Sequence, residues 1–240
     1  RKLGLGSSAA VTVAAVGVLC AAAGLRPEDP GTAALIRRAA AAAHDEAQGV
    51  RGSGADVLAS ALGGVRVLQD PTPRMPLELR GEVAGVLEPL EGATLTLPVE
   101  VLLVATGQAA STPHLVARYR AGVAEGRAVP ARDQLSAAAH AFQAAARAGD
   151  EAALLRAVAS AYQGYLALGE ALGEALVTAS HAALAEAARA LGGAAKPSGA
   201  GGGDLAVVFL PRQGSVAASQ RQRAELALRL PAECALLDLE

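Results

Sequence analysis

The chain has 240 residues and a formal net charge of −2, with 21 Lys or Arg against 23 Asp or Glu. This balance, without a lysine-rich block, argues against the basic surface that nucleic-acid binding needs, so nucleic acid is not an expected partner. Apolar residues make up 52% of the sequence and aromatic residues only 2%, so the core must consist of Ala, Leu and Val.

The two cysteines, Cys20 and Cys234, are far apart and form no Cys-x-x-Cys pair. Four histidines are scattered along the chain without the spacing of metal ligands. We therefore expect neither a disulfide scaffold nor a structural zinc site, and we expect a reducing, cytoplasmic compartment.

Residues 3–25 carry no charge and follow Arg1 and Lys2, a pattern shared with signal peptides and membrane spans. Two features argue against both: the run consists mostly of small residues, and Gly and Ser interrupt it at one end. We expect no membrane association. Because the chain begins with Arg rather than Met, we also expect that it is a fragment, cut just before its first motif.

In the first part of the chain, apolar residues at three-residue and four-residue steps predict a buried helix over residues 9–23. Its expected buried face comprises Val11, Ala14, Ala15, Val18 and Ala22. The other elements expected before residue 97 are a helix over 32–43, a short helix over 57–62, a strand over 65–68, a loop over 70–76 and strand pieces within 77–97.

In the second part, residues 99–105 are a continuous apolar run between Pro98 and Gly107, which predicts a central strand. The other elements expected here are helices over 111–125, 131–148, 151–172, 176–191 and 215–228, and a strand over 205–210. Because strands and helices alternate without a regular βαβ period, the sequence predicts an α+β fold, with a domain boundary near residue 97.

The first motif with functional content is Gly4-Leu5-Gly6-Ser7-Ser8-Ala9-Ala10, directly before a helix. Glycines allow a tight turn close to a ligand, and a helix N-terminus offers unpaired N–H donors and partial positive charge to a phosphate. The Gly-Lys-Ser/Thr ending of a Walker loop is absent. An ordinary N-cap of a buried helix is the alternative interpretation.

Two more segments have a composition that suits phosphate chemistry. The first is Gly52-Ser53-Gly54-Ala55-Asp56, in which Asp56 falls at the start of a helix. The helix dipole there stabilises a carboxylate, which could accept or orient a substrate proton. A plain N-cap aspartate is the alternative interpretation. The second is Ser198-Gly199-Ala200-Gly201-Gly202-Gly203-Asp204. Its glycines have no side chain, so a ligand or another backbone segment can pass close to it. A flexible linker is the alternative interpretation.

The order of these motifs resembles the GHMP kinase superfamily. Residues 4–10 match its second motif, Gly-Leu-Gly-Ser-Ser-Ala-Ala, at every position. Residues 198–204 are similar to its glycine-rich third motif. Within the superfamily, the likeness is to the phosphomevalonate kinase subfamily. The segments that carry it are Ala43-His44-Asp45-Glu46-Ala47-Gln48-Gly49, residues 52–57, Ala110-Ser111-Thr112-Pro113-His114-Leu115-Val116, and Lys196-Pro197.

The resemblance implies a two-domain α+β fold. Residues 1–96 would be the remnant of an N-terminal nucleotide-binding and catalytic domain, similar to ribosomal protein S5. Residues 97–240 would be a helix-rich, ferredoxin-like C-terminal GHMP domain.

The resemblance also implies an activity: transfer of the γ-phosphoryl group of ATP, with Mg²⁺, to the small molecule 5-phosphomevalonate. Asp56 matches the catalytic aspartate and Ser8 a magnesium ligand. The residues implied to wrap the nucleotide phosphates are Gly4, Leu5, Gly6, Ser7, Ser8 and Ala9. Those implied to close over the transferring phosphate, or to support the first loop, are Ser198, Gly199, Ala200, Gly201 and Gly202. Arg51 and Arg66 are candidate partners of a second phosphorylated ligand.

Two departures accompany this resemblance. In related mevalonate kinases a glutamate completes the magnesium site, whereas His44 aligns with it here, beside Asp45 and Glu46. The superfamily's first motif, with its lysine, would precede residue 4, so we expect the chain by itself to be inactive. Two alternatives remain open: a kinase for mevalonate or another small molecule, and a GHMP-like binding module without catalysis.

Overall fold

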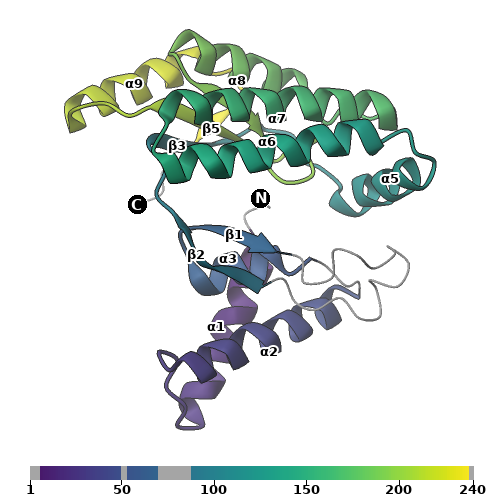
Figure 1. Cartoon of the computed structure of the whole chain (residues 1–240), viewed down its shortest axis with the longest axis vertical. Helices are drawn as coiled ribbons and strands as arrows, with labels where there is room; N and C mark the ends of the chain where they lie inside the picture. The colour runs from purple at the N-terminus through teal and green to yellow at the C-terminus, as the bar shows by residue number, and fades with distance from the viewer. Residues whose placement is uncertain (1–5, 50–52, 70–87, 238–240) are drawn as a thin grey trace. The chain divides into compact units, whose positions relative to one another are not determined.

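The computed structural model describes residues 6–49, 53–69 and 88–237. These residues fold as two compact units, one ending at Leu95 and the other beginning at Thr96. Both units combine helices with antiparallel strands, which confirms the expected α+β class (Figure 1). The assignment of residues 1–96 as a nucleotide-binding and catalytic domain stays a prediction.

The first unit combines helices with an antiparallel pair of strands. Its elements are α1 (Ser7–Ala22), α2 (Pro30–Gln48), α3 (Ala55–Leu62), β1 (Val65–Gln69) and β2 (Glu88–Leu95). The strand expected over 65–68 is therefore confirmed. The expected loop over 70–76, and residues 77–87, lie outside the described residues.

Small side chains let the three helices of this unit approach one another closely. Ala9, Ala40, Ala41 and Val57 form a buried cluster to which all three helices contribute. Alanine adds little bulk beyond the backbone, so helices that meet at alanine pack with short interaxial distances. The alanine-rich composition thus has a direct structural use here.

Helix α1 forms where it was expected, but the expected buried face is wrong. Ala9 and Cys20 are buried and Val13 packs against the cluster, whereas Val11 and Val18 are 69% and 67% exposed. Nearly every residue of α1 is apolar or small, so apolar periodicity cannot distinguish one face from another. Packing against α2 and α3 decides which face is buried.

The second unit is built on a four-stranded antiparallel sheet with strand order β4-β5-β3-β6. The strands are β3 (Val99–Ala105), β4 (Ala194–Pro197), β5 (Leu205–Pro211) and β6 (Ala235–Leu236). Strand β3 lies between β5 and β6, so the prediction of a central strand over 99–105 is confirmed. The helices are α5 (Thr112–Ala124), α6 (Val129–Ala148), α7 (Glu151–Leu172), α8 (Ala179–Ala190) and α9 (Val216–Arg229).

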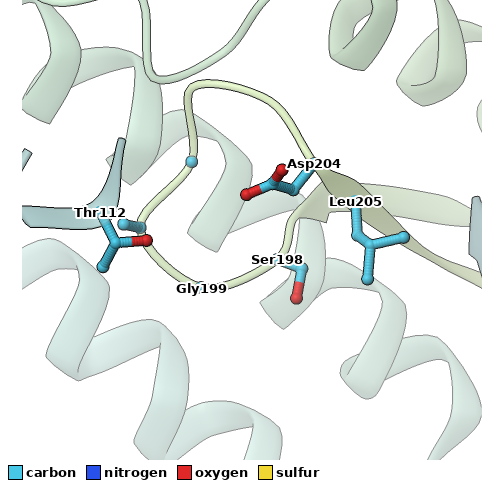
Figure 2. A pocket seen from close by; sticks show the side chains of 7 residues that line it. Thr112, Ser198, Gly199, Asp204 and Leu205 are labelled. Atoms are coloured by element: carbon cyan, nitrogen blue, oxygen red, sulfur yellow. The ribbon is translucent and has the colours of Figure 1, made fainter. Parts of the chain in front are cut away.

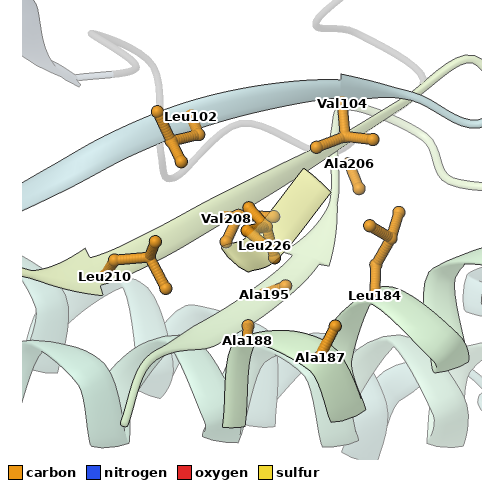
Figure 3. Packing of buried hydrophobic residues seen from close by; sticks show 10 residues of the cluster. All are labelled: Leu102, Val104, Leu184, Ala187, Ala188, Ala195, Ala206, Val208, Leu210 and Leu226. Carbon is orange, nitrogen blue, oxygen red and sulfur yellow. The ribbon is translucent and has the colours of Figure 1, made fainter. Parts of the chain in front are cut away.

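Alternate residues of β3 and β5 build the core of this unit, as the two-residue period of a strand requires. Leu102 pairs with Val208 and Val104 with Ala206. Figure 3 shows how these side chains meet residues from the neighbouring strand and helices. The cluster consists of Leu102, Val104, Leu184, Ala187, Ala188, Ala195, Ala206, Val208, Leu210 and Leu226. Phe209 follows Val208 in β5, so its side chain lies on the other face of the strand. There its ring contacts the ring of Phe142 of α6 edge to face, with 5.8 Å between the ring centres.

None of the described helices is both long and apolar enough to cross a membrane. The uncharged run at the start of the sequence contributes α1, which has 16 residues. A transmembrane helix needs about 20 apolar residues.

Two leucines of α9 provide a matched test of the core. Leu226 is fully buried in the cluster, whereas Leu228 is 87% exposed. Leu226→Ala is expected to lower the free energy of unfolding by about 2–5 kcal/mol, because it removes buried methyl groups and leaves a cavity. Leu228→Ala is expected to change it by less than about 0.5 kcal/mol. Urea unfolding followed by circular dichroism measures both; equal effects would contradict the packing.

Candidate active site

The start of α1 has the features of an anion-binding helix N-terminus. Gly6 is the N-cap, with φ 70°, and no side chain caps the helix. This left-handed conformation suits glycine, and the first-turn N–H groups of Ser7 and Ser8 are free of side-chain capping. No acidic residue lies in the first turn, so the helix dipole is available to a negatively charged ligand. Gly4 and Leu5 lie outside the described residues.

Helix α3 begins in the same way and carries Asp56 in its first turn. Its N-cap is Gly54, with φ 71°, and Oδ1 of Asp56 accepts a hydrogen bond from the Val57 N–H at 2.9 Å. The side chain of Asp56 is 44% exposed, so its carboxylate is accessible to a ligand. Arg51 and Gly52 lie outside the described residues.

His44 joins the two helix starts. Its Nε2 lies 3.1 Å from the Ser8 Oγ and 3.8 Å from the Asp56 Oδ2. A Cβ placed on Gly6 would lie 3.5 Å from the Cβ of Asp56, so the backbone at the start of α1 also approaches α3 closely. The structure thus brings two of the three sequence motifs together, and we call this group the Ser8–His44–Asp56 cluster.

The position of His44 follows from the length of α2. The sequence predicted a helix over 32–43, but α2 continues to Gln48 and ends at Gly49, with φ 65°. His44 therefore lies on the helix, one turn beyond Ala40 and two turns beyond Ile36, both of which are buried. That four-residue spacing was present in the sequence and is the signal that locates the His44 side chain.

The cluster is not a nucleophilic triad, because both contacts of His44 use the same nitrogen. A triad histidine receives a proton on Nε2 from a hydroxyl while its Nδ1–H donates to a carboxylate. Here the hydroxyl and the carboxylate both face Nε2. The arrangement holds a hydroxyl and a carboxylate beside a helix N-terminus, which suits binding of a phosphate together with a cation rather than acyl transfer.

The oxygen atoms of the cluster fit a magnesium ion that is shared with phosphate. Mg²⁺ prefers oxygen ligands and is usually held by one or two carboxylates together with substrate phosphates. Ser8 and Asp56 offer a hydroxyl and a carboxylate. Within residues 6–49, 53–69 and 88–237, no group of three or more His, Cys, Asp or Glu side chains is placed to hold a metal ion by itself.

Arg66 does not lie free for a phosphorylated ligand. Its Nε donates to the Gly63 carbonyl oxygen and its Nη2 to the Leu62 carbonyl oxygen, each at 2.9 Å. A third contact joins its Nη1 to the hydroxyl of Thr94 on β2. The guanidinium therefore satisfies the carbonyl groups at the end of α3 and joins that helix to the strands.

The glycine-rich segment over 198–204 is the turn of a hairpin between β4 and β5, in the second unit. A helix over 176–191 was the last element expected before it, whereas β4 intervenes and includes Lys196 and Pro197. The Ser198 N–H bonds the Leu205 carbonyl oxygen, and the Gly202 N–H bonds the Leu176 carbonyl oxygen at 2.8 Å. The segment is therefore a fixed turn rather than a linker.

This turn packs against the segment that begins α5. The Asp204 N–H donates to the Gln108 carbonyl oxygen at 2.7 Å, and the Ala110 N–H donates to the Asp204 carboxylate at 3.4 Å. Gly203 passes so close that a Cβ there would lie 3.0 Å from the Gln108 oxygen. The motif that begins at Ala110 and the glycine-rich motif, far apart in the sequence, are thus neighbours in the structure.

A small cavity lies within the turn (Figure 2). Its lining residues are Thr112, Ser198, Gly199, Ala200, Gly201, Asp204 and Leu205. The volume is about 70 Å³, which has room for one or two water molecules but not for a nucleotide. The role of residues 198–202 in holding the nucleotide therefore stays a prediction.

The side chain of Tyr165, which had no expected role, contacts the turn and also lies beside Lys196. The Tyr165 hydroxyl of α7 donates to the Gly199 carbonyl oxygen at 2.6 Å, and Lys196 Nζ lies 5.8 Å from the centre of the Tyr165 ring. Removal from solvent lowers the pKa of the Lys196 ammonium and raises the pKa of the Tyr165 phenol. Lys196 belongs to a segment that carries the resemblance, whereas no motif in the sequence points to Tyr165.

His181 fixes the other end of the turn. Its Nε2 lies 3.2 Å from the Leu205 carbonyl oxygen, and its Nδ1 lies 3.2 Å from the Thr178 N–H. The second contact is part of a capping box at the start of α8. Burial lowers the pKa of the His181 imidazole, because desolvation disfavours its charged form.

Two glycines of the turn allow a matched test of its rigidity. Both have positive φ, but a Cβ on Gly201 would lie 2.7 Å from the Leu176 carbonyl oxygen, whereas one on Gly199 meets no atom within 4 Å. Each substitution by Ala costs about 1–2 kcal/mol for the left-handed backbone. Gly201→Ala is expected to lower stability by at least about 1 kcal/mol more than Gly199→Ala, because the clash is with backbone. Thermal unfolding of the two variants compares them; identical midpoints would contradict a fixed turn.

Several known kinases are similar to this chain. Residues 1–64 match the GHMP kinases N terminal domain. The chain is 35% identical to a phosphomevalonate kinase from Streptomyces sp. strain CL190, over 96% of this chain and 63% of that protein. It therefore spans less than two thirds of this relative's length.

Two solved structures show the same fold. The Lin0012 protein from Listeria innocua has a TM-score of 0.79 and 25% identity, covering 99% of this chain and 66% of that one. The Streptococcus pneumoniae phosphomevalonate kinase in complex with phosphomevalonate and AMPPNP has a TM-score of 0.74 and 20% identity, covering 99% of this chain and 69% of that one. By the N-terminal domain match and the Streptomyces relative, the chain is similar to GHMP kinases, and to a phosphomevalonate kinase over most of its own length.

Proposed function

We propose that the protein containing this chain transfers the γ-phosphoryl group of ATP to 5-phosphomevalonate, giving diphosphomevalonate in the mevalonate route to isoprenoids. One observation carries the proposal: in a chain 35% identical to a phosphomevalonate kinase, an uncapped helix N-terminus and Asp56 are held together through His44. Phosphoryl transfer depends mainly on positioning and on stabilising charge, and this arrangement offers both.

In this proposal the nucleotide phosphates bind at the start of α1. The residues that would hold them are Gly4, Leu5, Gly6, Ser7, Ser8 and Ala9. Ser8 and Asp56 would share a magnesium ion with the phosphates, and Mg²⁺ supplies neutralisation of their negative charge. Residues 198–202 would support the first loop or close over the transferring group.

Asp56 has a modest chemical task when the acceptor is a phosphate. An alcohol must lose a proton as it attacks, whereas a phosphate group presents an oxygen that is already ionised near neutral pH. Asp56, placed by α3 and by its contact with the Val57 N–H, would orient the acceptor and the metal. We also propose a cytoplasmic location and a small-molecule substrate, 5-phosphomevalonate, as the partner.

The acceptor is tested by ADP release coupled to a spectrophotometric assay, with 5-phosphomevalonate, mevalonate and homoserine offered separately. We expect turnover with 5-phosphomevalonate and at least about tenfold lower kcat/KM with the two unphosphorylated alcohols. Turnover confined to an alcohol would overturn the assignment of the acceptor. Absence of turnover with all three, while ATP still binds, would favour the binding-module alternative.

Asp56→Asn is expected to lower kcat at least about tenfold, which corresponds to about 1.4 kcal/mol of transition-state stabilisation. The amide keeps the shape of the side chain but removes the negative charge. Asp133→Asn is the matched control, because Asp133 lies exposed on α6 and pairs with the adjacent Arg132. An unchanged kcat in Asp56→Asn would remove Asp56 from the mechanism.

A further inference from the structure

The glycine-rich segment begins with a tight β-turn of defined type. The Gly201 N–H bonds the Ser198 carbonyl oxygen at 3.3 Å, which closes a turn of four residues. Gly199, the second of them, has φ 59°. In the described part of the chain Asp204 is the only non-glycine residue with positive φ, so Ala200, the third residue of the turn, has negative φ. This combination defines a type II′ turn, which takes glycine at its second position.

The central peptide of this turn joins Gly199 to Ala200, and the turn itself does not fix its direction. The hydrogen bond that closes a β-turn joins the first and last residues, so the central peptide takes no part in it. Rotating that peptide by half a revolution exchanges its C=O and N–H and converts type II′ into type I′. Gly199 permits both forms, whereas Ala200 opposes the rotated one, because type I′ needs positive φ at the third position.

Tyr165 of α7 fixes the direction of this peptide from outside the turn. Its hydroxyl donates to the Gly199 carbonyl oxygen at 2.6 Å, and a carbonyl oxygen can only accept, so the donor in this hydrogen bond is certain. No peptide bond in the described residues is cis, and in a planar trans peptide the C=O and the N–H point in opposite directions. The hydrogen bond to Gly199 therefore directs the Ala200 N–H away from Tyr165.

Packing holds the ring of Tyr165 in turn. The ring lies against a buried cluster that includes Leu115 of α5 and Leu168 of α7, and the Lys196 Nζ lies 5.8 Å from its centre. Gly199, by contrast, is exposed, and a Cβ placed on it would meet no atom within 4 Å. At Gly199 the turn is therefore held by a hydrogen bond from a fixed side chain rather than by packing.

The Ala200 N–H is a directed donor that the turn leaves free. Within the residues that the structure describes, no acceptor bonds it. Backbone N–H groups held in a turn bind anions, and a donor whose direction is fixed in advance needs no rearrangement when the anion arrives. A phosphate oxygen is a suitable acceptor for such a group.

We propose that Tyr165 is a positioning residue whose hydroxyl locks the Gly199–Ala200 peptide, so that the Ala200 N–H is presented to a phosphate group. The inference rests on the proposed function for the identity of the ligand that carries this phosphate, either ATP or the acceptor. The direction of the peptide does not depend on that function. Tyr165 acts through the peptide and not by contact with the ligand.

The first test observes the peptide without any assay of activity. Nuclear Overhauser spectra of the protein containing this chain distinguish the two forms, because the amide protons of Gly199 and Ala200 are close in type I′ and far apart in type II′. We expect no cross-peak between these amides in the unsubstituted protein. Ala200→Gly removes the steric bias but keeps the Tyr165 hydrogen bond, so we expect no cross-peak there either.

Combining Ala200→Gly with Tyr165→Phe removes both constraints, and the cross-peak between the amides of residues 199 and 200 is then expected to appear. Phenylalanine keeps the ring and its packing and removes only the hydroxyl. A cross-peak in the unsubstituted protein or in Ala200→Gly alone, or none in the combined variant, would overturn the inference.

The second test measures the effect on the ligand. We expect Tyr165→Phe to raise the KM of one phosphate-bearing substrate about threefold and the combined variant to raise it at least about tenfold, with kcat within about twofold of the unsubstituted protein. A higher KM for ATP assigns the Ala200 N–H to the nucleotide, and a higher KM for 5-phosphomevalonate assigns it to the acceptor. A lower kcat with both KM values unchanged is the signature of lost folded protein and would reject the positioning role.

Tyr162→Phe is the matched control. It removes the same hydroxyl one turn earlier on α7, and the hydrogen bonds described for the glycine-rich turn do not include Tyr162. We expect its KM values and spectra to equal those of the unsubstituted protein; an equal rise in KM in Tyr162→Phe would contradict a role specific to Tyr165. If the unsubstituted protein shows no turnover with any acceptor, the proposed function fails, and the amide spectra still decide whether Tyr165 locks the peptide.

Discussion

The close approach of three alanine-rich helices is the constraint on which the candidate site depends. Each member of the Ser8–His44–Asp56 cluster lies next to a residue of the buried cluster beneath it. Ala9 follows Ser8, Val57 follows Asp56, and Ala40 precedes His44 by one helical turn. The same contacts that bury these apolar groups therefore set the distances between the polar ones. A larger side chain at Ala9 or Ala40 would separate the helices and the site together.

The glycine-rich turn of the second unit depends on the opposite property, the absence of side chains. Gly201 and Gly203 let the turn lie against the backbone of two other segments at distances that a Cβ would prevent. Main-chain hydrogen bonds to Leu176 and Gln108 then hold it in place. The glycine-rich composition is typical of flexible linkers, but here it forms a turn with fixed neighbours. Each glycine either lies close to another part of the chain or has a left-handed backbone conformation.

Local patterns predicted most elements, and tertiary contacts account for what they missed. The strand over 99–105 was predictable because a short apolar run between Pro98 and Gly107 suits an interior strand. The buried face of α1 was not predictable, because a helix of small apolar residues has no polar face that marks its exposed side. The motifs identified Ser8 and Asp56, and the resemblance singled out His44, but its contacts with both side chains are visible only in the fold. Tyr165 and His181 contact main-chain atoms of the turn, and such contacts leave no pattern in the sequence.

The enclosed imidazole of His181 makes the second unit sensitive to acid. Both of its nitrogens are engaged by main-chain groups, one at the cap of α8 and the other at the start of β5. Because the folded state lowers the pKa of His181, the unfolded chain takes up a proton first as the pH falls below about 6.5. The contribution of His181 to folding stability is therefore fully present above that pH and is lost as the pH falls below it. Proton uptake at Nδ1 would compete directly with the Thr178 N–H, so acid would loosen the cap of α8, whereas the Nε2–H contact with the Leu205 carbonyl oxygen would persist.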